Sequence, residues 1–434
     1  MLSSSVFILL LFFLCPGQPA PQCAVPESQK DLVTYLLNLM VQAETDNAQN
    51  SLNPNPSLLL GLRLAQQHNL SVEQSALTKL QQDVVSKIQG GLPFSSGNVA
   101  LYCMAMQASC HDPSDIPASV LPGGKLNLVN VLEEKLVEEI FNIEKAGTPV
   151  TNYYQVSLDV LALCLMGKPM TALTTQVLID AAKTNKFNLS GTFSVDTGSV
   201  AVLALTCLKQ FKTIQAFPTL QSRIESTIRK LITKIEQQKQ ESGIIGNLYS
   251  TGLAAQALVA NQVNFNCNKT IKTILAQVSA GAFNNPMTAS QIVPFLGGYT
   301  YLNVSSLKCS ADQNNLPLPT PTHTSPPSSS NISVQFTVAN PFLNSSNSID
   351  VSVLNGSTLL TVMEKAAQLD PQHFSFTIQP SAYGPYVTSI QGVAGNSTDH
   401  TYWQFLSGTT SLSQGVGDYK PKNGEHLVAL FSTY

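Results

Sequence analysis

The chain is poor in charge. Only 11% of its 434 residues are Asp, Glu, Lys or Arg, against roughly 25% in an average soluble protein. The formal net charge is −3, so the composition favours neither nucleic acid nor an anionic membrane surface as a partner. Beyond the first residues no apolar run is long enough to span a bilayer. A chain with so little charge needs another source of solubility.

Several chemical motifs are also absent. The sequence has no Cys-x-x-Cys pair with a nearby histidine, so a structural metal site is not expected. It has no Gly-rich phosphate loop, and no histidine stands at motif-like spacing from a Ser or Cys nucleophile. These absences argue against nucleotide chemistry and nucleophilic catalysis.

The N-terminal residues read as a secretory signal. The apolar run at residues 6–14 has the length of a signal-peptide core, and we expect residues 1–20 to be removed. Export gives meaning to eight Asn-x-Ser/Thr sites, since these accept N-linked glycans in secreted proteins. They are Asn69, Asn188, Asn268, Asn303, Asn331, Asn344, Asn355 and Asn396. The sequence therefore predicts a secreted, extracellular glycoprotein whose sugars supply solubility.

Six short segments rich in Ala and Leu recur along the first two thirds of the chain. They lie at residues 57–65, 98–106, 157–165, 198–208, 250–258 and 289–297. Their spacing suits paired-helix repeats, and a helix that is apolar all round must be buried on every side. Each is followed by a more polar partner. The pattern predicts an inner ring of helices inside an outer ring, an all-α (α/α)6 barrel, over residues 21–309.

The composition changes after the barrel. Residues 310–330 are rich in Pro, Ser and Thr and predict an extended linker. Residues 331–434 then show period-2 alternation, with strands expected at 332–338, 349–354, 374–378, 386–390, 402–405 and 426–431 and one helix at 358–369. We expect a small α+β, β-rich domain with a grasp-like fold.

Cysteine usage fits an oxidising compartment. Removal of the signal takes Cys15 away and leaves seven cysteines, which suggests three disulfides and one thiol. Cys164 and Cys207 occupy nearly the same register of successive inner segments, so repeat geometry pairs them. Cys103 lies in the middle of another inner segment and is expected to be the free, buried thiol.

Two carboxylates are the candidates for an enzyme. Glycosidases built on helical barrels need a pair of carboxylates about 5–10 Å apart, and Asp159 and Asp196 both fall at inner segments. Asp196 is equally suited to cap the helix that follows it. Asp159, on an apolar helix, needs a partner if it is buried. A secreted glycan hydrolase using this pair is the alternative function.

Uncharged hydrogen-bonding and aromatic residues gather where inner helices should start. Residues 151–155 read Thr-Asn-Tyr-Tyr-Gln, residues 245–252 contain Asn247 and Tyr249, and Gln291 follows a third such stretch. The small domain adds Tyr383 and Trp403, the single tryptophan. Amides, hydroxyls and rings without charge suit a large neutral ligand rich in amides. The alternative is that these aromatic residues fill the core of the small domain.

At these residues the chain resembles the vertebrate cobalamin (vitamin B12) carriers, and more closely the haptocorrin and intrinsic factor branches than transcobalamin. The segments that carry the resemblance are residues 151–164, 194–198, 243–246, 249–252 and 402–408. The resemblance runs from about Cys23 to Tyr434. It implies a helical barrel, a flexible linker and a small β-rich domain, with the corrinoid buried between the domains and no chemistry performed on it. It also implies an uptake receptor and a monomeric protein.

The resemblance further implies specific residues. From the barrel, cobalamin would be contacted by Thr151, Asn152, Tyr153, Tyr154, Gln155, Asp196, Asn247 and Gln291. From the small domain it would be contacted by Ala382, Tyr383, Gly384, Pro385, Tyr386, Val387, Trp403, Gln404, Phe405, Leu406, Ser407, Gly408 and Leu412. The disulfides would be Cys23–Cys267, Cys110–Cys309 and Cys164–Cys207, with Cys103 left unpaired.

Three departures from the family pattern affect function. Tyr383 stands where Trp is expected, and Asn247 where intrinsic factor has Asp. Transcobalamin has a histidine that can reach cobalt before its Ser-Val-Asp-Thr stretch, whereas Thr192 and Phe193 stand here. We therefore expect no protein ligand on the metal. Residues 151–155 favour haptocorrin and residues 249–253 favour intrinsic factor, a mixture that would fit one carrier combining both roles.

Overall fold

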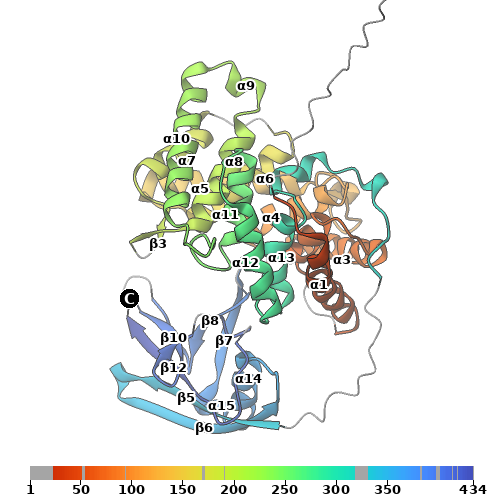
Figure 1. The fold of residues 1–434 in the computed structure, drawn as a ribbon. Helices are drawn as coiled ribbons and strands as arrows, with labels where there is room; N and C mark the ends of the chain where they lie inside the picture. Colours follow the sequence, from red (N-terminus) through yellow and green to blue (C-terminus); the bar gives the residue numbers. More distant parts are fainter. Residues whose placement is uncertain are drawn as a thin grey trace, which may run out of the picture.

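A computed structural model describes residues 23–50, 54–92, 94–168, 172–189, 191–317, 331–381, 384–396, 401–412, 414–417 and 419–433. The predicted signal segment with Cys15, most of the predicted linker, and Ala382 and Tyr383 lie outside the described residues. The described chain forms a helical domain and a smaller β-rich domain (Figure 1). Within the described residues, no helix is both long and apolar enough to cross a membrane.

Six helices form a closed inner ring. Each overlaps one of the segments predicted to be an inner helix, and no segment extends more than two residues beyond its helix. They are α2 (Pro56–Arg63), α4 (Ser96–Ala108), α6 (Tyr153–Leu165), α8 (Val195–Leu208), α11 (Thr251–Ala260) and α13 (Pro286–Leu296). In this order each helix packs on the next, and α13 packs back on α2. In α8 every residue from Gly198 to Leu208 is buried. The predicted (α/α)6 barrel is confirmed.

The outer helices are amphipathic and cover this ring. They are α1 (Lys30–Asn50), α3 (Leu70–Gln89), α5 (Leu128–Ala146), α7 (Ala172–Lys183), α10 (Pro218–Gln237) and α12 (Cys267–Ser279). In α10 the buried residues include Ile224, Ile228, Leu231 and Ile235, the i, i+4, i+7 spacing of one helix face. The remaining helical segments and short strand pairs are α9 (Lys212–Gln215), η1 (Glu27–Gln29), η2 (Pro122–Gly124), η3 (Tyr301–Ser306), η4 (Cys309–Ala311), β1 (Ile116–Pro117), β2 (Lys125–Leu126), β3 (Asn188–Leu189) and β4 (Thr192–Phe193).

Glycines let the inner helices approach closely. A Cβ at Gly252 in α11 would lie 2.7 Å from the backbone oxygen of Gln291 in α13, and one at Gly61 in α2 would lie 3.0 Å from Ser290 Cα. These are backbone atoms that cannot rotate away. Glycine at these two positions therefore lets α2 and α11 pack closely on α13.

Three disulfides lie in the helical domain. They join Cys23 to Cys267, Cys110 to Cys309 and Cys164 to Cys207, the same pairs that the resemblance implies. The third links neighbouring inner helices α6 and α8, as the repeat geometry suggested. Among the described cysteines, Cys103 is unpaired and buried.

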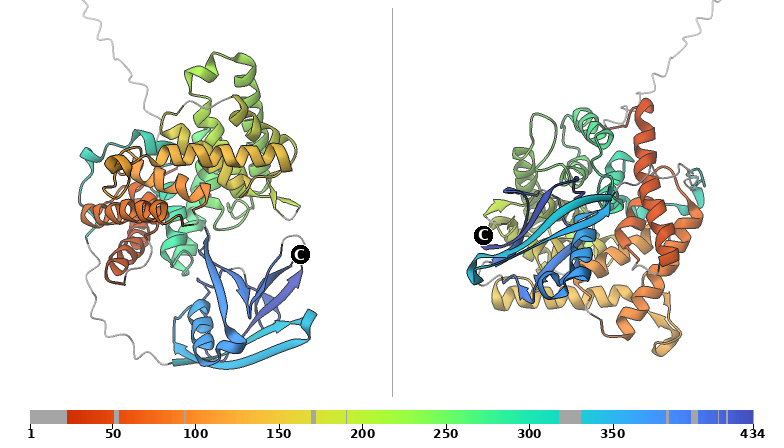
Figure 2. Two further views of the ribbon diagram at one scale, coloured as in Figure 1. Left: turned by 180° about the vertical axis from the view of Figure 1, so that it is seen from behind. Right: turned by 90° about the horizontal axis from the view of Figure 1, so that it is seen from below.

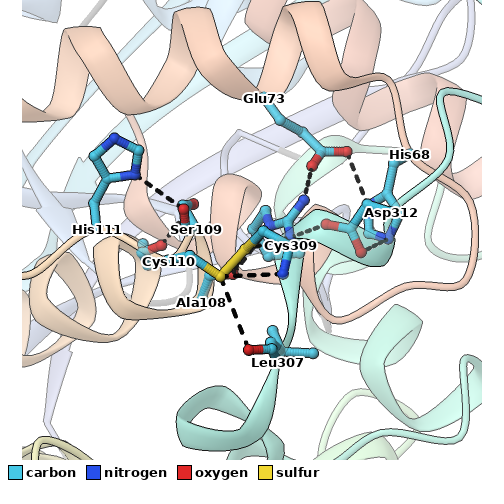
Figure 3. Close-up of a disulfide and its surroundings, with 11 residues drawn as sticks. His68, Glu73, Ala108, Ser109, Cys110, His111, Leu307, Cys309 and Asp312 are labelled. Atoms are coloured by element: carbon cyan, nitrogen blue, oxygen red, sulfur yellow. Dashed lines mark hydrogen bonds and ion pairs between the residues drawn. A yellow bond between two sulfur atoms is a disulfide. The ribbon is translucent and has the colours of Figure 1, made fainter.

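The first part of the predicted linker packs on the helical domain instead of leaving it. Arg63, which is 4% exposed, pairs with Glu73 and Asp312, and its Nε donates to Ala108 O at 3.0 Å. Glu73 and Asp312 lie close to the Cys110–Cys309 disulfide (Figure 3). Farther along, Leu316 is 1% exposed and its N–H donates to His68 O at 2.9 Å. A buried arginine needs carboxylate partners, and Asp312 supplies one. The chain is thus held to the helical domain through Leu316.

This anchored segment also buries a predicted glycosylation site. Asn69 is 3% exposed, and its Nδ2 donates to Leu316 O at 2.9 Å. Its Oδ1 caps α3 by accepting from Val72 N at 3.2 Å. Both ends of the amide are therefore used inside the protein.

The small domain is built on a five-stranded sheet with strand order β11-β10-β12-β5-β6. Its first strand β5 pairs in parallel with its last strand β12, and the other pairs are antiparallel. The helix α14 packs on β5 and β6. A central parallel pair of first and last strands with a helix on one face is a grasp-like arrangement, as predicted. The elements are β5 (Asn331–Asn340), η5 (Pro341–Leu343), β6 (Ser345–Leu354), α14 (Leu359–Leu369), α15 (Pro371–Phe374), β10 (Thr401–Ser407), β11 (Thr410–Ser411) and β12 (His426–Thr433).

A second, three-stranded sheet extends from the small domain toward the ring. It contains β7 (Phe376–Ser381), β8 (Gly384–Ile390) and β9 (Val393–Ala394), paired in that order. In Figures 1 and 2, the β7–β8 hairpin reaches from the small domain toward the helical domain. The described residues of β8 that were predicted to contact a ligand therefore lie on the side that faces the barrel.

Candidate functional site

The N-terminal ends of the inner helices meet at one end of the ring. Asn55, which precedes α2, donates through Nδ2 to Met287 Sδ in the first turn of α13 at 2.7 Å. Gly97 N in α4 donates to Gln155 Oε1 in α6 at 3.1 Å. Because neighbouring inner helices touch through their first turns, they run parallel and open at the same mouth. The segment η3, which follows the C-terminal end of α13, packs on α4, α6 and α8 and covers the opposite end.

Uncharged side chains cap the helices at this mouth. Five of the six inner helices have an Asn or Ser cap that accepts from a backbone N–H of the first turn: Asn55, Ser95, Asn152, Ser194 and Asn285. Before α11, Asn247 Oδ1 accepts from Tyr249 N at 2.9 Å and Ser250 N at 2.8 Å. Such caps satisfy the helix N–H groups without adding charge. The mouth is consequently polar and close to neutral.

The stretch 151–155 lies at the start of α6. Asn152 is exposed and caps the helix, accepting from Gln155 N at 3.0 Å. Tyr153 is 9% exposed and packs edge-on against Phe187, with its pKa raised by burial. Tyr154 is half-buried. Of these five residues, all except Tyr153 are at least partly exposed to solvent at the mouth.

Thr151, which precedes α6, is held by hydrogen bonds to a buried residue of the outer ring. Its N–H donates to Glu139 Oε2 at 3.0 Å and its hydroxyl to Glu139 Oε1 at 2.6 Å. Glu139 lies on the outer helix α5 and is 2% exposed. The backbone that carries Thr151 is therefore fixed by a buried carboxylate.

Asp196 lies in the first turn of α8, where its Oδ2 accepts from Ser250 Oγ at 2.9 Å. The cap of α8 is Ser194, so the sequence-based alternative that Asp196 caps this helix is wrong. Capping by Ser194 leaves the Asp196 carboxyl free to reach across to the neighbouring helix. Burial raises the pKa of Asp196, and burial together with the Asp196 charge raises the pKa of Tyr301 to about 12.

Asn247 and Gln291 complete the barrel side. Asn247 is exposed beside the start of α11, and Gln291 is half-buried in α13. Near Asn247, the Tyr249 ring packs edge-on against Phe283, and its hydroxyl accepts from Gln414 Nε2 of the small domain at 3.3 Å. This hydrogen bond joins the two domains at the mouth.

The predicted residues of the small domain lie on β8, β10 and the turn that follows. Tyr386 is 57% exposed, whereas Val387 is buried in the core. Gln404 Nε2 donates to Ser411 Oγ at 2.7 Å, and Ser407 Oγ donates to Glu425 Oε1 at 2.6 Å. Gly384 and Pro385 belong to β8, and Gly408 has a positive φ in the turn after β10. Leu406 is buried, and Phe405 and Leu412 are partly buried against the core.

Trp403 belongs to the core of the small domain. It is 7% exposed, its Nε1 donates to Val393 O at 2.8 Å, and its ring packs on Phe431 with centroids 5.0 Å apart. Side chains of a strand alternate between faces, so Gln404 and Leu406 lie on the other face of β10. Trp403 therefore supports the position of its neighbours and offers a ligand little surface.

Asp159, the other carboxylate of the hydrolase alternative, lies inside the ring. It is 0% exposed and lies near Ser96 and Glu139, and neither carboxylate oxygen has a described residue in good hydrogen-bond geometry. Burial raises its pKa well above the ordinary value. A carboxyl with no exposed surface cannot reach a glycosidic bond, which argues against a hydrolytic pair with Asp196.

The position that could supply a cobalt ligand carries an aromatic ring. Phe193 precedes α8, and a Cβ at Gly198 would lie 2.3 Å from its Cζ, so the ring lies against the first turn of the helix. Within the described residues, no group of three or more His, Cys, Asp or Glu side chains could hold a metal ion.

Several residues of the mouth were not predicted from the sequence. Ser250 was part of a noted segment, but its bond to Asp196 was not foreseen. Gln414 and Glu139 had no local signal, since Gln414 lies in an irregular stretch and Glu139 is one of several acids on α5. Their partners are 165 and 12 residues away in sequence.

A closed helical ring whose polar mouth faces a small β domain defines a two-domain ligand-binding protein. The sequence profile of the eukaryotic cobalamin-binding proteins matches residues 5–330, and that of a domain of unknown function matches residues 356–433. The chain belongs to the eukaryotic cobalamin-binding protein family.

Its relatives match over nearly their whole length. Human transcobalamin-1 is 37% identical over 98% of both chains, and human cobalamin binding intrinsic factor is 35% identical over 99% of both. Rat transcobalamin-2 is 33% identical over 96% of this chain and 97% of its own. The crystal structure of haptocorrin in complex with Cbi is 34% identical in sequence, with a TM-score of 0.73 over 95% of this chain and 99% of that chain.

Proposed function

We propose that this protein is a secreted glycoprotein that binds cobalamin and related corrinoids with high affinity between its two domains. Its role is to protect and carry the corrinoid for receptor-mediated uptake, and it performs no chemistry on it. The observation that carries the proposal is the polar, nearly neutral mouth of the barrel, which faces the small domain. Full-length similarity to transcobalamin-1 and intrinsic factor supports the same ligand class.

The chemistry of the mouth suits a corrinoid. A corrin ring carries many neutral amide side chains around an apolar macrocycle, so its binding site needs hydrogen-bonding groups without strong charge. The capping Asn152 with Gln155, the exposed Asn247 and the half-buried Gln291 supply such groups. Asp196, with a raised pKa, is the one acid in the proposed set and is bonded to Ser250.

The two-domain layout supports binding in two steps. The barrel presents a preformed mouth, and the small domain closes over the ligand afterwards, using the β8 residues and the face of β10 that carries Gln404. The Gln414–Tyr249 hydrogen bond is one contact that closure uses. Burial of a large ligand between two surfaces slows its release more than it speeds its capture.

The cobalt would keep its own ligands. The ring of Phe193 lies against the first turn of α8, and neither Phe193 nor Thr192 has a side chain that can coordinate cobalt through nitrogen. The bound cobalamin should therefore have the visible spectrum of its free form.

Addition of aquocobalamin to the purified protein tests the proposal. After gel filtration we expect one corrinoid to co-elute per chain, with band positions that show no new nitrogen ligand on cobalt. Loss of all colour from the protein peak would overturn the carrier function. Band shifts typical of histidine coordination would overturn the proposal that the protein supplies no cobalt ligand, and would leave the carrier function standing.

The closure step has its own test. A protease site placed within residues 318–330 allows the two domains to be separated after loading. Cleavage should speed corrinoid release far more than it slows capture. If release is unchanged after cleavage, the small domain does not close over the ligand.

The subtype follows from selectivity. Equal affinity for cobalamin and for analogues with an altered base indicates haptocorrin-like scavenging, and strong rejection of the analogues indicates intrinsic factor-like selectivity. The sequence carries features of both, so we propose a single carrier that combines the roles.

A further inference from the structure

The loop between α5 and α6 is fixed to α5 by an unusual set of bonds. Three side chains pin its short path from Gly147 to Asn152. Asn142 Nδ2 donates to Thr148 O at 2.8 Å near the start of the loop. Asn152 caps α6 at its end. Between these points, Glu139 accepts from both the N–H and the hydroxyl of Thr151.

Glu139 is the unusual member because it is a buried acid. It is 2% exposed, whereas the four other acids of α5 lie on more accessible positions: Glu133, Glu134, Glu138 and Glu144. A buried carboxylate is costly unless its oxygens accept hydrogen bonds. Here three donors meet it, since Ser96 Oγ also donates to Oε1 at 2.9 Å. Oε1 thus accepts from two hydroxyls and Oε2 from one backbone N–H.

The donors come from two neighbouring parts of the mouth. Ser96 is the first residue of α4, and Thr151 is in the loop before α6. The next residue, Gly97, donates its N–H to Gln155 Oε1, and a Cβ at Gly97 would lie 2.7 Å from Gln155 Cγ. The first turns of α4 and α6 are therefore joined twice, through Glu139 and through the Gly97–Gln155 contact.

We infer that Glu139 is a positioning residue for corrinoid binding. In this role, which rests on the proposed function, Glu139 holds residues 151–155 in the conformation that contacts the ligand. Glu139 itself does not contact the ligand. It acts through Thr151. Charge-assisted hydrogen bonds are about twice as strong as neutral ones, so this carboxylate can fix a loop backbone that a neutral side chain would leave looser.

Glu139→Gln tests the inference with little change in size. The uncharged amide keeps an acceptor oxygen for the Thr151 N–H and turns the other acceptor into a donor. The Thr151 and Ser96 hydroxyls must then rotate to accept from it, and the charge-assisted bonds are lost. We expect corrinoid release to become about tenfold faster, the change that corresponds to about 1.4 kcal/mol. Glu138→Gln is the matched control, since Glu138 is the preceding residue and is exposed, and its release rate should equal that of the wild type.

A double-mutant cycle with Thr151→Val separates positioning from a general loss of stability. If Glu139 acts through Thr151, the two effects combine to less than their product, because Thr151→Val removes the hydroxyl bond and keeps only the N–H bond to Glu139. Independent effects that multiply would overturn the inference, as would an unchanged release rate in Glu139→Gln alone. Failure of the wild type itself to retain a corrinoid would instead overturn the proposed function.

Hydrogen exchange gives a measurement that needs no variant. In the ligand-free wild type, the Thr151 amide should exchange slowly, because it donates to a buried carboxylate, while the exposed Val150 amide beside it exchanges fast. Equally fast exchange at both amides would overturn the inference even if Glu139→Gln cannot be obtained as folded protein.

Discussion

The buried acid Glu44 in α1 provides a quantitative test of the helical domain. It is 3% exposed, and its Oε2 has no hydrogen-bond partner among the described residues. Burial raises its pKa from 4.5 to about 7, although the charge of Lys79 opposes this. At 1.36 kcal/mol per pH unit, this difference corresponds to about 3 kcal/mol of folding free energy.

The sign of the effect follows from proton linkage. The folded state holds the Glu44 proton more tightly than the unfolded state does, so the stability associated with this group is present below pH 4.5 and lost as the pH rises through about 7. Glu44→Gln removes the ionisation. We expect the variant to gain about 3 kcal/mol relative to wild type between pH 4 and pH 8.5, whatever constant effect the amide itself has.

Denaturant unfolding of both proteins across this range measures the gain. Glu241→Gln is the control, since Glu241 is exposed in a turn, and its effect should not vary with pH in this way. A difference between Glu44→Gln and wild type that stays constant from pH 4 to pH 8.5 would refute the argument from burial.

Three further predictions concern close packing, glycosylation and thiol chemistry. Gly252→Ala should lower the free energy of unfolding by about 1–2 kcal/mol, because the cost of overpacking against the Gln291 backbone exceeds the gain in helix propensity from alanine. Ala276→Gly on the exposed side of α12 measures that propensity by itself. Equal or higher stability of Gly252→Ala would contradict the packing argument. Glycopeptide mapping should find Asn69 without a glycan and the exposed Asn268 and Asn344 with one, because the Asn69 amide is buried against Leu316. A glycan on Asn69 in the folded protein would show that residues 314–316 pack differently on the helical domain. Cys103 should not react with a thiol reagent in the native protein and should react once per chain after unfolding, because burial raises the pKa of its thiol.

The sequence was sufficient to predict the architecture. Inner helices such as residues 198–208 are apolar on all sides, and this property has few explanations other than burial in a ring. The strands of the small domain were predicted from alternation, and most observed bounds extend the expected ones by a few residues, as for β5 at Asn331–Asn340. The strand expected at 374–378 is shifted to Phe376–Ser381, because Phe374 ends the short helix α15. These features are local, so a single sequence contains them.

The structure of the mouth could not be predicted in the same way. The sequence allowed Asp196 to be the helix cap, but Ser194, two residues earlier, has that role. The hydrogen bond between Asp196 and Ser250 depends on which helices become neighbours in the ring. Docking of residues 310–316 depends on Arg63, more than 240 residues away. Interactions between distant parts of the chain leave no periodic pattern, and a Pro-containing polar segment reads as a linker whether or not its first residues are held.

Closure of the ring restricts how this protein can evolve. Solenoids of helical pairs gain or lose pairs at their ends, but here α13 packs on α1 and α2, and a disulfide joins Cys23, before α1, to Cys267 at the start of α12. A ring has no free end at which a pair can be added. A seventh pair between α12 and α1 would have to separate helices that now pack on each other and displace the Cys23–Cys267 disulfide. Changes in ligand preference are thus confined to the helix caps, the loops at the mouth and the small domain, while the number of helical pairs stays at six.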